Sequence, residues 1–195
     1  MAPPRHDPAP RIDWLPAADL ADGRRGRIGL TVLPGKRGPS VRYPGRIYRG
    51  DLGHDLAALR AAGVRRLVLL VDDAELARWG DAAIVERAAE IGLPVVRHPI
   101  PDGGTPRDVA GMRAILSSVA EGRETGDVAV ACMGGVGRSG TVVACALVDA
   151  GWRPDDAIRR VRAVRHPTAV ETAAQTAFVH QYYREGGHSS ARVAP

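Results

Sequence analysis

A short apolar segment, a glycine-rich loop and a second apolar segment follow one another over residues 127–150. The first, residues 127–132 (DVAVAC), is a continuous apolar run typical of a strand covered on both faces. The last, residues 138–150, has the length and apolar content of a buried helix. Five residues connect them, and three of the five are glycine. A strand followed so closely by a helix is typical of α/β folds, and the segment predicts that class.

The rest of the chain alternates between the same two patterns. Strand-like runs lie at residues 28–33, 67–71 and 95–96, and helical patterns lie at residues 52–63, 81–91, 105–119, 157–164 and 168–182. Thr105 is predicted to cap the third of these helices, and Thr168 with Glu171 to form a capping box for the last. The alternation predicts an α/β domain with a central, mostly parallel sheet flanked by helices and a helical C-terminal part.

Length and composition favour one domain with a real core, because the chain has 195 residues, of which 45% are hydrophobic and 25% charged. We expect the globular part at residues 27–185. We expect residues 1–26 to form a flexible arm, although Trp14 and Leu15 can dock on the body. We also expect residues 186–195 to form a flexible tail. No apolar run reaches the roughly 20 residues of a membrane helix, and no signal peptide is evident. Two cysteines fit a reducing cytosol, so we expect a cytoplasmic protein.

The net charge of +5 comes almost entirely from arginine, since Lys36 is the only lysine. A bias toward arginine codons explains such a composition, and so does a surface suited to phosphate or other anions. The arginines are scattered and form no like-charge block, so no nucleic-acid partner is expected. The lack of a membrane-length apolar run means that no membrane partner is expected either.

The loop after residue 132 has the chemistry of an anion-binding cradle. Its glycines allow successive backbone amides to turn inward, and the following helix directs its free N-terminal amides at the same point. Arg138 adds a planar guanidinium that holds two phosphate oxygens, and Cys132 supplies a thiolate that can attack phosphorus. Phosphate, sulfate or vanadate is expected to bind there, held by Met133, Gly134, Gly135, Val136, Gly137 and Arg138. The alternatives are a buried structural thiol and an ordinary glycine turn.

These residues make the chain recognisable. The Cys132-x5-Arg138-Ser139 motif, residues 99–106 (PIPDGGTP) and residues 30–35 (LTVLPG) resemble the cysteine-dependent dual-specificity phosphatases, in particular the group around the cyclin-dependent-kinase-associated phosphatase. The resemblance covers residues 27–185 and implies the single-domain protein tyrosine phosphatase-like fold. In that family a histidine usually precedes the nucleophile and helps to set the loop's hydrogen bonds and the low thiol pKa. Here the position is Ala131, so a less depressed thiol pKa is expected.

The resemblance assigns roles to three further residues. Asp102 matches the general acid that protonates the leaving oxygen and later activates water; its alternative is a plain loop carboxylate. Ser139 matches a hydroxyl that hydrogen-bonds the cysteine sulfur, and it also suits a helix cap. Gln175 matches a glutamine that positions water, with a solvated helix residue as the alternative.

Other candidate residues have simpler interpretations. Cys145 is predicted to be a core residue and not a resolving thiol, and His98 to order the loop of Asp102. Arg165 and His166 either border the pocket or form a surface turn. No cysteine and histidine cluster has metal-ligand spacing, so neither a metal nor another cofactor is expected.

The pattern therefore predicts a phosphoprotein phosphatase that forms a phospho-cysteine intermediate. The loop carries no lysine of the kind that holds extra phosphates, which favours a monophosphate on a protein: phosphotyrosine, and in a shallow pocket phosphoserine or phosphothreonine too. Two alternatives stay open. A weakly active pseudophosphatase would bind phosphoproteins without turnover, and a rhodanese-type sulfurtransferase also uses a cysteine in a short anion-binding loop. The oligomeric state and the preferred phosphoresidue are left open by the sequence.

Overall fold

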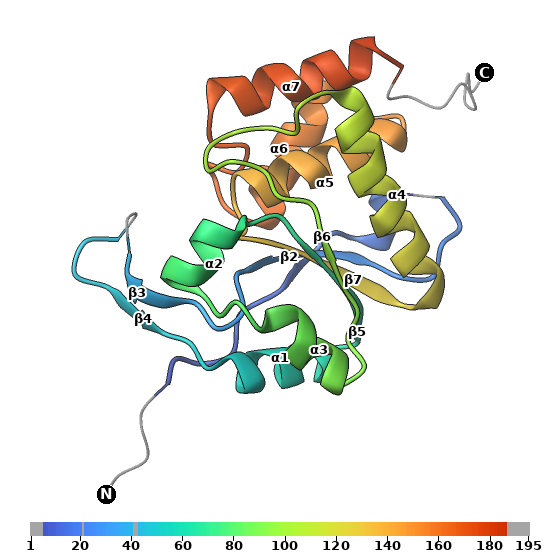
Figure 1. Ribbon diagram of the computed structural model, residues 1–195. Helices are drawn as coiled ribbons and strands as arrows, with labels where there is room; N and C mark the ends of the chain where they lie inside the picture. The colour runs from blue at the N-terminus through green and yellow to red at the C-terminus, as the bar shows by residue number, and fades with distance from the viewer. Residues whose placement is uncertain (1–5, 21, 41–42, 187–195) are drawn as a thin grey trace, which may run out of the picture.

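The computed structural model describes residues 6–20, 22–40 and 43–186. Within them, a mixed sheet has the strand order β1-β2-β7-β5-β6, and a separate hairpin pairs β3 with β4 (Figure 1). The strands are β1 (Asp13–Trp14), β2 (Ile28–Val32), β3 (Arg37–Pro39), β4 (Ile47–Arg49), β5 (Val64–Leu69), β6 (Val95–Arg97) and β7 (Asp127–Cys132). Strands β2, β7, β5 and β6 are parallel, and β1 runs antiparallel to β2. The predicted α/β fold with a mostly parallel sheet is confirmed.

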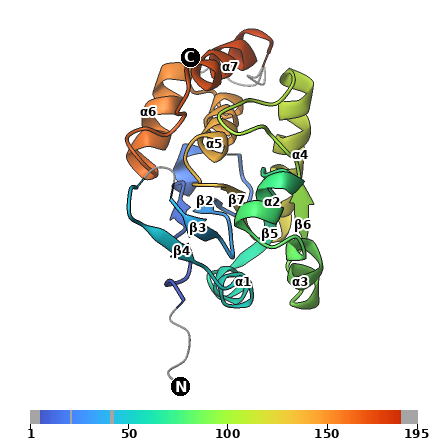
Figure 2. The same ribbon diagram turned by 60° about the vertical axis from the view of Figure 1, so that its left-hand side comes forward.

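Helices cover both faces of the sheet. They are α1 (Leu52–Ala61), α2 (Asp73–Trp79), α3 (Ile84–Glu90), α4 (Val109–Thr125), α5 (Arg138–Asp149), α6 (Pro154–Val164) and α7 (Ala173–Arg184), with a short 3-10 helix at Ala17–Asp19. Helices α1 and α3 lie below the sheet in Figure 1, whereas α4 and α5 lie above it, with α6 and α7 packed on α5. Figure 2 gives the same arrangement from another side. None of the helices in the described ranges has the length and apolar character of a membrane span.

The sheet separates two hydrophobic clusters. Side chains alternate between the faces of a strand, so Val128 and Val130 join the cluster under α4 to α7, whereas Ala129 and Ala131 join the cluster over α1 to α3. All four are fully buried. Strand β7 is therefore the centre of the fold, and the loop that follows it starts from a rigid support.

One helix near the site was not predicted. The sequence patterns place a single helix at residues 81–91, whereas the structure has α2 at Asp73–Trp79 and a shorter α3 at Ile84–Glu90. Helix α2 begins at a capping box in which Asp72 accepts a hydrogen bond from the Glu75 amide and the Glu75 side chain accepts one from the Asp72 amide. Seven residues are too few to give a clear helical period.

Two predicted helix starts were wrong. Helix α4 begins at Val109 with Asp108 as its cap, because the Asp108 carboxylate and not Thr105 accepts from a first-turn amide. Helix α7 begins at Ala173, where Thr172 and Gln175 form the capping box that was assigned to Thr168 and Glu171. In both cases a nearby polar side chain offers the same capping chemistry one turn further along the chain.

The N-terminal segment is not a free arm where the structure describes it. Strand β1 pairs with β2, Leu15 and Leu20 are buried, and the Trp152 indole donates to the Asp19 carbonyl at 2.8 Å. The prediction of a flexible arm is therefore wrong for residues 13–20. Trp14 and Leu15 dock on the body, which was the alternative that the sequence left open. The expected tail at residues 186–195 lies outside the described residues, apart from Gly186.

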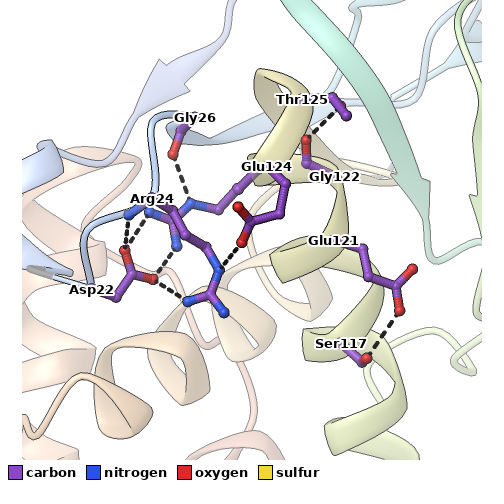
Figure 3. Close-up of polar contacts among 9 residues, drawn as sticks. Asp22, Arg24, Gly26, Ser117, Glu121, Gly122, Glu124 and Thr125 are labelled. Carbon is purple, nitrogen blue, oxygen red and sulfur yellow. Dashed lines mark hydrogen bonds and ion pairs between the residues drawn. The ribbon is translucent and has the colours of Figure 1, made fainter.

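A second anchor holds the same segment to the end of α4. The Asp22 carboxylate accepts from both terminal nitrogens of Arg123, at 2.5 and 3.0 Å, and the Arg123 Nε donates to the Gly26 carbonyl at 2.7 Å. Arg24 bridges Asp22 and Glu124, as Figure 3 shows. Burial alone would raise the pKa of Asp22, but the hydrogen bonds and charge of Arg123, with help from Arg24, lower it to about 2.

Candidate active site

The candidate site lies at the carboxyl end of β7, the central strand. Cys132 is the last residue of β7, Arg138 is the first residue of α5, and residues 133–137 join them. We call residues 132–138 the P-loop. The Cys132 side chain is buried, with 2% of its surface exposed. The structure therefore brings the predicted nucleophile and the predicted arginine to the two ends of one tight loop.

The shape of the P-loop requires glycine at position 135. Gly135 has φ of +65°, and a Cβ there would lie 2.3 Å from the Thr31 carbonyl oxygen. A Cβ on Gly137 would lie 2.5 Å from Glu171 Oε2. Gly134, in contrast, has open space on its side-chain side, with the nearest atom 3.9 Å away. At 135 the loop backbone thus packs against β2 at a distance that only glycine allows, whereas at 137 the neighbouring atom is the end of a flexible side chain.

The carbonyl groups of the P-loop bond to the surrounding protein. The Arg165 guanidinium donates to the carbonyls of Gly134 at 2.9 Å and Gly135 at 3.0 Å. The Val136 carbonyl accepts from the Val170 amide at 3.3 Å, and the Gly137 carbonyl accepts from the Thr141 amide at 2.9 Å.

The amides of the same loop have no such partners. Those of residues 133–137 donate to no oxygen or nitrogen acceptor among the described residues. Together with the free amides at the start of α5 they supply donors for one bound oxyanion.

The Cys132 thiol lies in an environment that favours its thiolate. Burial alone would raise the pKa of the thiol. The positive charge of Arg138, the Ser139 hydroxyl and the amides of Ser139 and Gly134 outweigh burial, so the pKa lies below its ordinary value. The buried Ser139 Oγ makes no hydrogen bond of ordinary geometry within the described residues. Its proton can therefore rotate onto the sulfur once the thiolate forms.

Arg138 is held from three directions and is 2% exposed. Its Nη1 and Nη2 donate to the two carboxylate oxygens of Glu75 at 2.6 and 2.7 Å, and Nη1 also donates to the Ile100 carbonyl at 2.9 Å. Its Nη2 further donates to Asp102 Oδ1 at 3.0 Å. The bidentate pair with Glu75 fixes the plane of the guanidinium and keeps it charged in a buried position.

Glu75 is the residue of the site that sequence reasoning missed. It lies on α2, 63 positions before its partner Arg138. One signal was available: the sequence Asp72-Asp73-Ala74-Glu75 directly follows the strand pattern at residues 67–71 and has the spacing of a capping box. Because α2 was not predicted, that carboxylate was not assigned to the end of the sheet where the P-loop lies.

Asp102 lies on an exposed turn beside the P-loop. We call residues 99–104 the acid loop. The Asp102 side chain is 82% exposed, and its one polar partner in the described residues is Arg138. The turn is closed by a hydrogen bond from the Gly104 amide to the Pro101 carbonyl at 2.9 Å, with Gly103 at φ of +67°. The structure thus brings the predicted general acid to the predicted phosphate-binding arginine.

Gln175 connects the acid loop to the start of α7. Its Nε2 donates to the Gly104 carbonyl at 3.0 Å, and its Oε1 accepts from the Glu171 amide at 2.9 Å. Thr172 adds a parallel bond from its hydroxyl to the Gly103 carbonyl at 3.0 Å. Gln175 is fully buried, which excludes the solvated alternative. Its predicted role in positioning water stays a prediction, and its observed contacts hold the acid loop.

Arg165 borders the site and carries more contacts than the sequence indicated. It is 11% exposed, and besides the two P-loop carbonyls its Nη1 contacts Asp13 Oδ2 at 2.5 Å. Asp13 belongs to β1, in the segment expected to be a flexible arm. A hydrogen-bonded path therefore runs from the N-terminal strand to the back of the P-loop. His166 lies beside it and lines the cleft.

Two residues considered from the sequence lie outside the reactive cluster. Cys145 is fully buried in the core on α5, and burial, followed by the charge of Asp149, raises the pKa of its thiol well above the ordinary value. His98 is half-buried and its Nε2 lies 2.9 Å from the Ser118 hydroxyl, while burial lowers its pKa. No cluster of three or more histidine, cysteine or acidic side chains suited to a metal occurs in the described part of the chain.

A single open cleft of about 860 Å³ connects these groups. Cys132, Arg138, Asp102 and Gln175 all line it, as do Met133, Gly134 and Val136 of the P-loop. The β3–β4 hairpin and α2 also contribute side chains to the lining of the cleft. A bound anion at the P-loop therefore has room for a larger attached group in the cleft.

Comparison with known proteins identifies the family. The model of the cyclin-dependent kinase inhibitor 3 family matches residues 5–158. Cyclin-dependent kinase inhibitor 3 from Rattus norvegicus is 29% identical over 178 residues, which cover 88% of this chain and 78% of the relative. The protein of the same name from Homo sapiens is 28% identical over 161 residues, covering 80% of this chain and 71% of the relative.

Solved structures agree on the fold. Kinase associated phosphatase with serine in place of its catalytic-site cysteine superposes with a TM-score of 0.79 at 24% identity, over 92% of this chain and 97% of that one. Tk-PTP in its active form gives a TM-score of 0.64 at 29% identity, over 84% and 93%. The expected tyrosine and dual-specificity phosphatase fold is confirmed, and the chain belongs to the cyclin-dependent kinase inhibitor 3 family.

Proposed function

We propose that this chain hydrolyses phosphate monoesters on protein side chains through a phospho-cysteine intermediate. The observation that carries the proposal is the set of groups that favour an anion at Cys132. Its thiol pKa is lowered by the charge of Arg138, the Ser139 hydroxyl and the amides of Ser139 and Gly134, and the amides of residues 133–137 donate to no oxygen or nitrogen acceptor in the described part of the chain. Residues 27–185 form the catalytic domain in this proposal, and the cytoplasm is its location.

The first step transfers the phosphoryl group to the enzyme. The Cys132 thiolate attacks phosphorus, the P–S bond forms and the P–O ester bond breaks. The Asp102 carboxyl donates its proton to the leaving oxygen, so the side chain departs as a neutral alcohol or phenol. Arg138 and the amides of residues 133–137 hold the non-bridging oxygens and stabilise the charge that spreads over them.

The second step regenerates the thiolate. Water attacks phosphorus, its proton passes to the Asp102 carboxylate, and the P–S bond breaks to release inorganic phosphate. The Ser139 hydroxyl donates a hydrogen bond to the departing sulfur. Gln175, which already holds the acid loop, orients the attacking water. Cys132, Asp102, Arg138 and Gln175 line the cleft, and Ser139, which follows Arg138 in the sequence, is buried.

The substrate of the proposal is a phosphorylated protein. The names of the relatives point to kinases as the class of partner. Phosphotyrosine is the first substrate class of the proposal, and phosphoserine and phosphothreonine are included because Cys132 lines an open cleft of about 860 Å³. Phosphate, sulfate and vanadate are the expected competitors at the P-loop.

Hydrolysis of an aryl phosphate by four proteins tests the proposal: the natural chain and the variants Cys132→Ser, Asp102→Ala and Arg138→Lys. We expect turnover by the natural chain, none by Cys132→Ser with phosphopeptide binding retained, and severe loss in Arg138→Lys. Asp102→Ala is expected to lose most turnover with poor leaving groups. Activity that survives in Cys132→Ser would overturn the covalent mechanism.

The same proteins distinguish the two alternatives. A natural chain that binds phosphopeptide tightly and hydrolyses no aryl phosphate would be a pseudophosphatase, for which the absent family histidine at Ala131 is the motivating feature. Transfer of sulfur from thiosulfate to cyanide, in place of phosphate release, would identify a sulfurtransferase.

A further inference from the structure

One wall of the cleft carries cations that the proposed reaction does not use. It is formed by the β3–β4 hairpin together with α2, and it brings Lys36, Arg46, Tyr48, Arg78 and Trp79 into the lining of the cleft. Figure 2 shows the hairpin and α2 on the same side of the molecule, near the end of β7. We call these five residues the cationic wall.

The arginines of the cationic wall lie over aromatic rings. The Arg46 guanidinium lies 4.7 Å from the centroid of the Tyr48 ring, and the Arg78 guanidinium lies 4.7 Å from that of Trp79. The Lys36 ammonium lies over the same Tyr48 ring at 4.0 Å. A ring is not a hydrogen-bond acceptor for all five N–H groups of a guanidinium, so both arginines keep N–H groups that can donate to a carboxylate or phosphate.

These two arginines differ from their neighbours in having no anion. Neither Arg46 nor Arg78 makes an ion pair or a side-chain hydrogen bond within the described residues, and both are exposed. Three other arginines at this end of the sheet are paired with carboxylates: Arg97 with Asp73 at 2.6 Å, Arg138 with Glu75 and Arg165 with Asp13.

The acidic residues of α2 are already engaged. Asp72 accepts from the Glu75 amide, Asp73 pairs with Arg97, and Glu75 pairs with Arg138. Arg46 and Arg78 therefore present positive charge to the cleft that no carboxylate of the described residues neutralises.

The wall is held in a fixed shape. Gly38 of β3 pairs with Tyr48 of β4, and at φ of +95° its backbone packs against the Trp79 ring, where a Cβ would lie 2.9 Å from the ring. The Gly50 amide donates to the Lys36 carbonyl at 2.8 Å and closes the base of the hairpin. A backbone held in this way needs little ordering when a substrate binds, which favours affinity.

We propose that the cationic wall is a specificity site for acidic residues that flank the phosphorylated residue of a protein substrate, with Arg46 and Arg78 each binding a carboxylate. This inference rests on the proposed function, because it needs the phosphoresidue at the P-loop. It narrows the substrate class to acidic phosphorylated segments of proteins.

The test compares two phosphotyrosine peptides that differ only in their flanks, one with glutamate and the other with glutamine at the same positions. The proteins are the natural chain, Arg46→Gln/Arg78→Gln, and a control, Arg25→Gln/Arg184→Gln, whose two arginines are exposed and do not line the cleft. We expect the natural chain and the control to favour the glutamate peptide about five- to tenfold in kcat/KM at low salt, and high salt to reduce the preference. The wall variant is expected to lose the preference while its kcat/KM for a small aryl phosphate is unchanged.

Binding to the same panel on a Cys132→Ser background separates this inference from the proposed function. If no protein hydrolyses an aryl phosphate, the proposed function fails, and fluorescence anisotropy of the labelled peptides still decides whether the wall selects glutamate. Equal preference in the natural chain and the wall variant, or no preference in either, overturns the inference. If a soluble inositol bisphosphate, and not the glutamate peptide, binds in a manner that depends on Arg46 and Arg78, a lipid headgroup replaces the protein segment and the inference is also overturned.

Discussion

Arg165 and Asp13 form an ion pair, with Arg165 Nη1 2.5 Å from Asp13 Oδ2, that joins the N-terminal strand to the P-loop. The same guanidinium donates to the carbonyls of Gly134 and Gly135. Because these carbonyls point toward Arg165, we expect the amides of the loop to point away from it, toward the phosphate-binding position. The pair therefore orders the loop in a protein that has Ala131 where the family usually has histidine.

We predict that loss of the pair raises the pKa of the Cys132 thiol. In Asp13→Asn the partner of Arg165 loses its charge. In Arg165→Lys the planar group that donates to both P-loop carbonyls is lost. In either variant the amides that stabilise the thiolate become less well ordered. The rate of Cys132 alkylation by iodoacetamide, measured against pH, reports this pKa directly. We expect the midpoint to move to higher pH in both variants and kcat/KM to fall roughly tenfold.

The matched control is Asp19→Asn. Like Asp13, Asp19 is an N-terminal carboxylate that forms an ion pair with an arginine: its Oδ2 lies 2.6 Å from Nε of Arg160 on α6. Neither residue of this pair makes a hydrogen bond or ion pair with the P-loop in the described part of the chain. Asp19→Asn should lower stability without moving the alkylation midpoint. If Asp19→Asn shifts the alkylation midpoint as much as Asp13→Asn does, the prediction is wrong, and the ion pair of Arg165 with Asp13 contributes only to general stability.

Glu75 is predicted to set the position of Arg138. Replacing Glu75 by Gln removes the charge but keeps the capping chemistry, because glutamine also serves at the third position of a capping box. Helix α2 should therefore remain, while Arg138 loses its bidentate ionic partner. We expect kcat/KM for an aryl phosphate to fall about 10- to 100-fold. Asp73→Asn, on the same helix and paired with Arg97, should change it little; equal losses in both variants would contradict the prediction.

What the sequence could predict depends on distance along the chain. The nucleophile, the arginine and the glycines lie within seven consecutive positions, 132–138, so one motif contains the P-loop. The contacts that orient it are not local: Glu75 is 63 positions from Arg138, and Asp13 is 152 positions from Arg165. Such pairs leave no periodic signal in a single sequence.

The structural elements that carry these distant residues were also the hardest to predict. Helix α2 spans seven residues and β1 spans two, which is too short for an amphipathic pattern to repeat. Long elements such as α4 and α5 were predicted because their apolar residues recur over several turns. Even there the first residue was missed where two capping side chains lay close together, as with Thr105 and Asp108.

Asp22 is predicted to make folding stability depend on pH in the acid range. Its pKa is lowered from 3.8 to about 2, so the folded state binds its proton less readily than the unfolded state does. The contribution of ionised Asp22 to the free energy of unfolding is complete above the pKa that Asp22 has in the unfolded chain. It is lost as pH falls from about 3.8 through about 2. Because the carboxylate is partly exposed, we expect it to be about 1 kcal/mol. Urea denaturation of the natural chain and Asp22→Asn should give a difference at neutral pH that shrinks toward pH 2; a constant difference would exclude the ionised pair as its source.

The P-loop glycines give the last prediction, a contrast between neighbours. Alanine at 135 would have to adopt φ of +65° and place its Cβ 2.3 Å from the Thr31 carbonyl, a backbone group that cannot rotate away. Strain of this kind costs about 1–3 kcal/mol, and the loop must shift to relieve the contact. Alanine at 134 meets nothing closer than 3.9 Å. Gly135→Ala should therefore lose both phosphatase activity and vanadate binding while Gly134→Ala keeps both, as measured by aryl phosphate hydrolysis and by vanadate inhibition. Equal activity in the two variants would mean that the loop backbone is free to move away from β2, contrary to the close packing that defines the cradle.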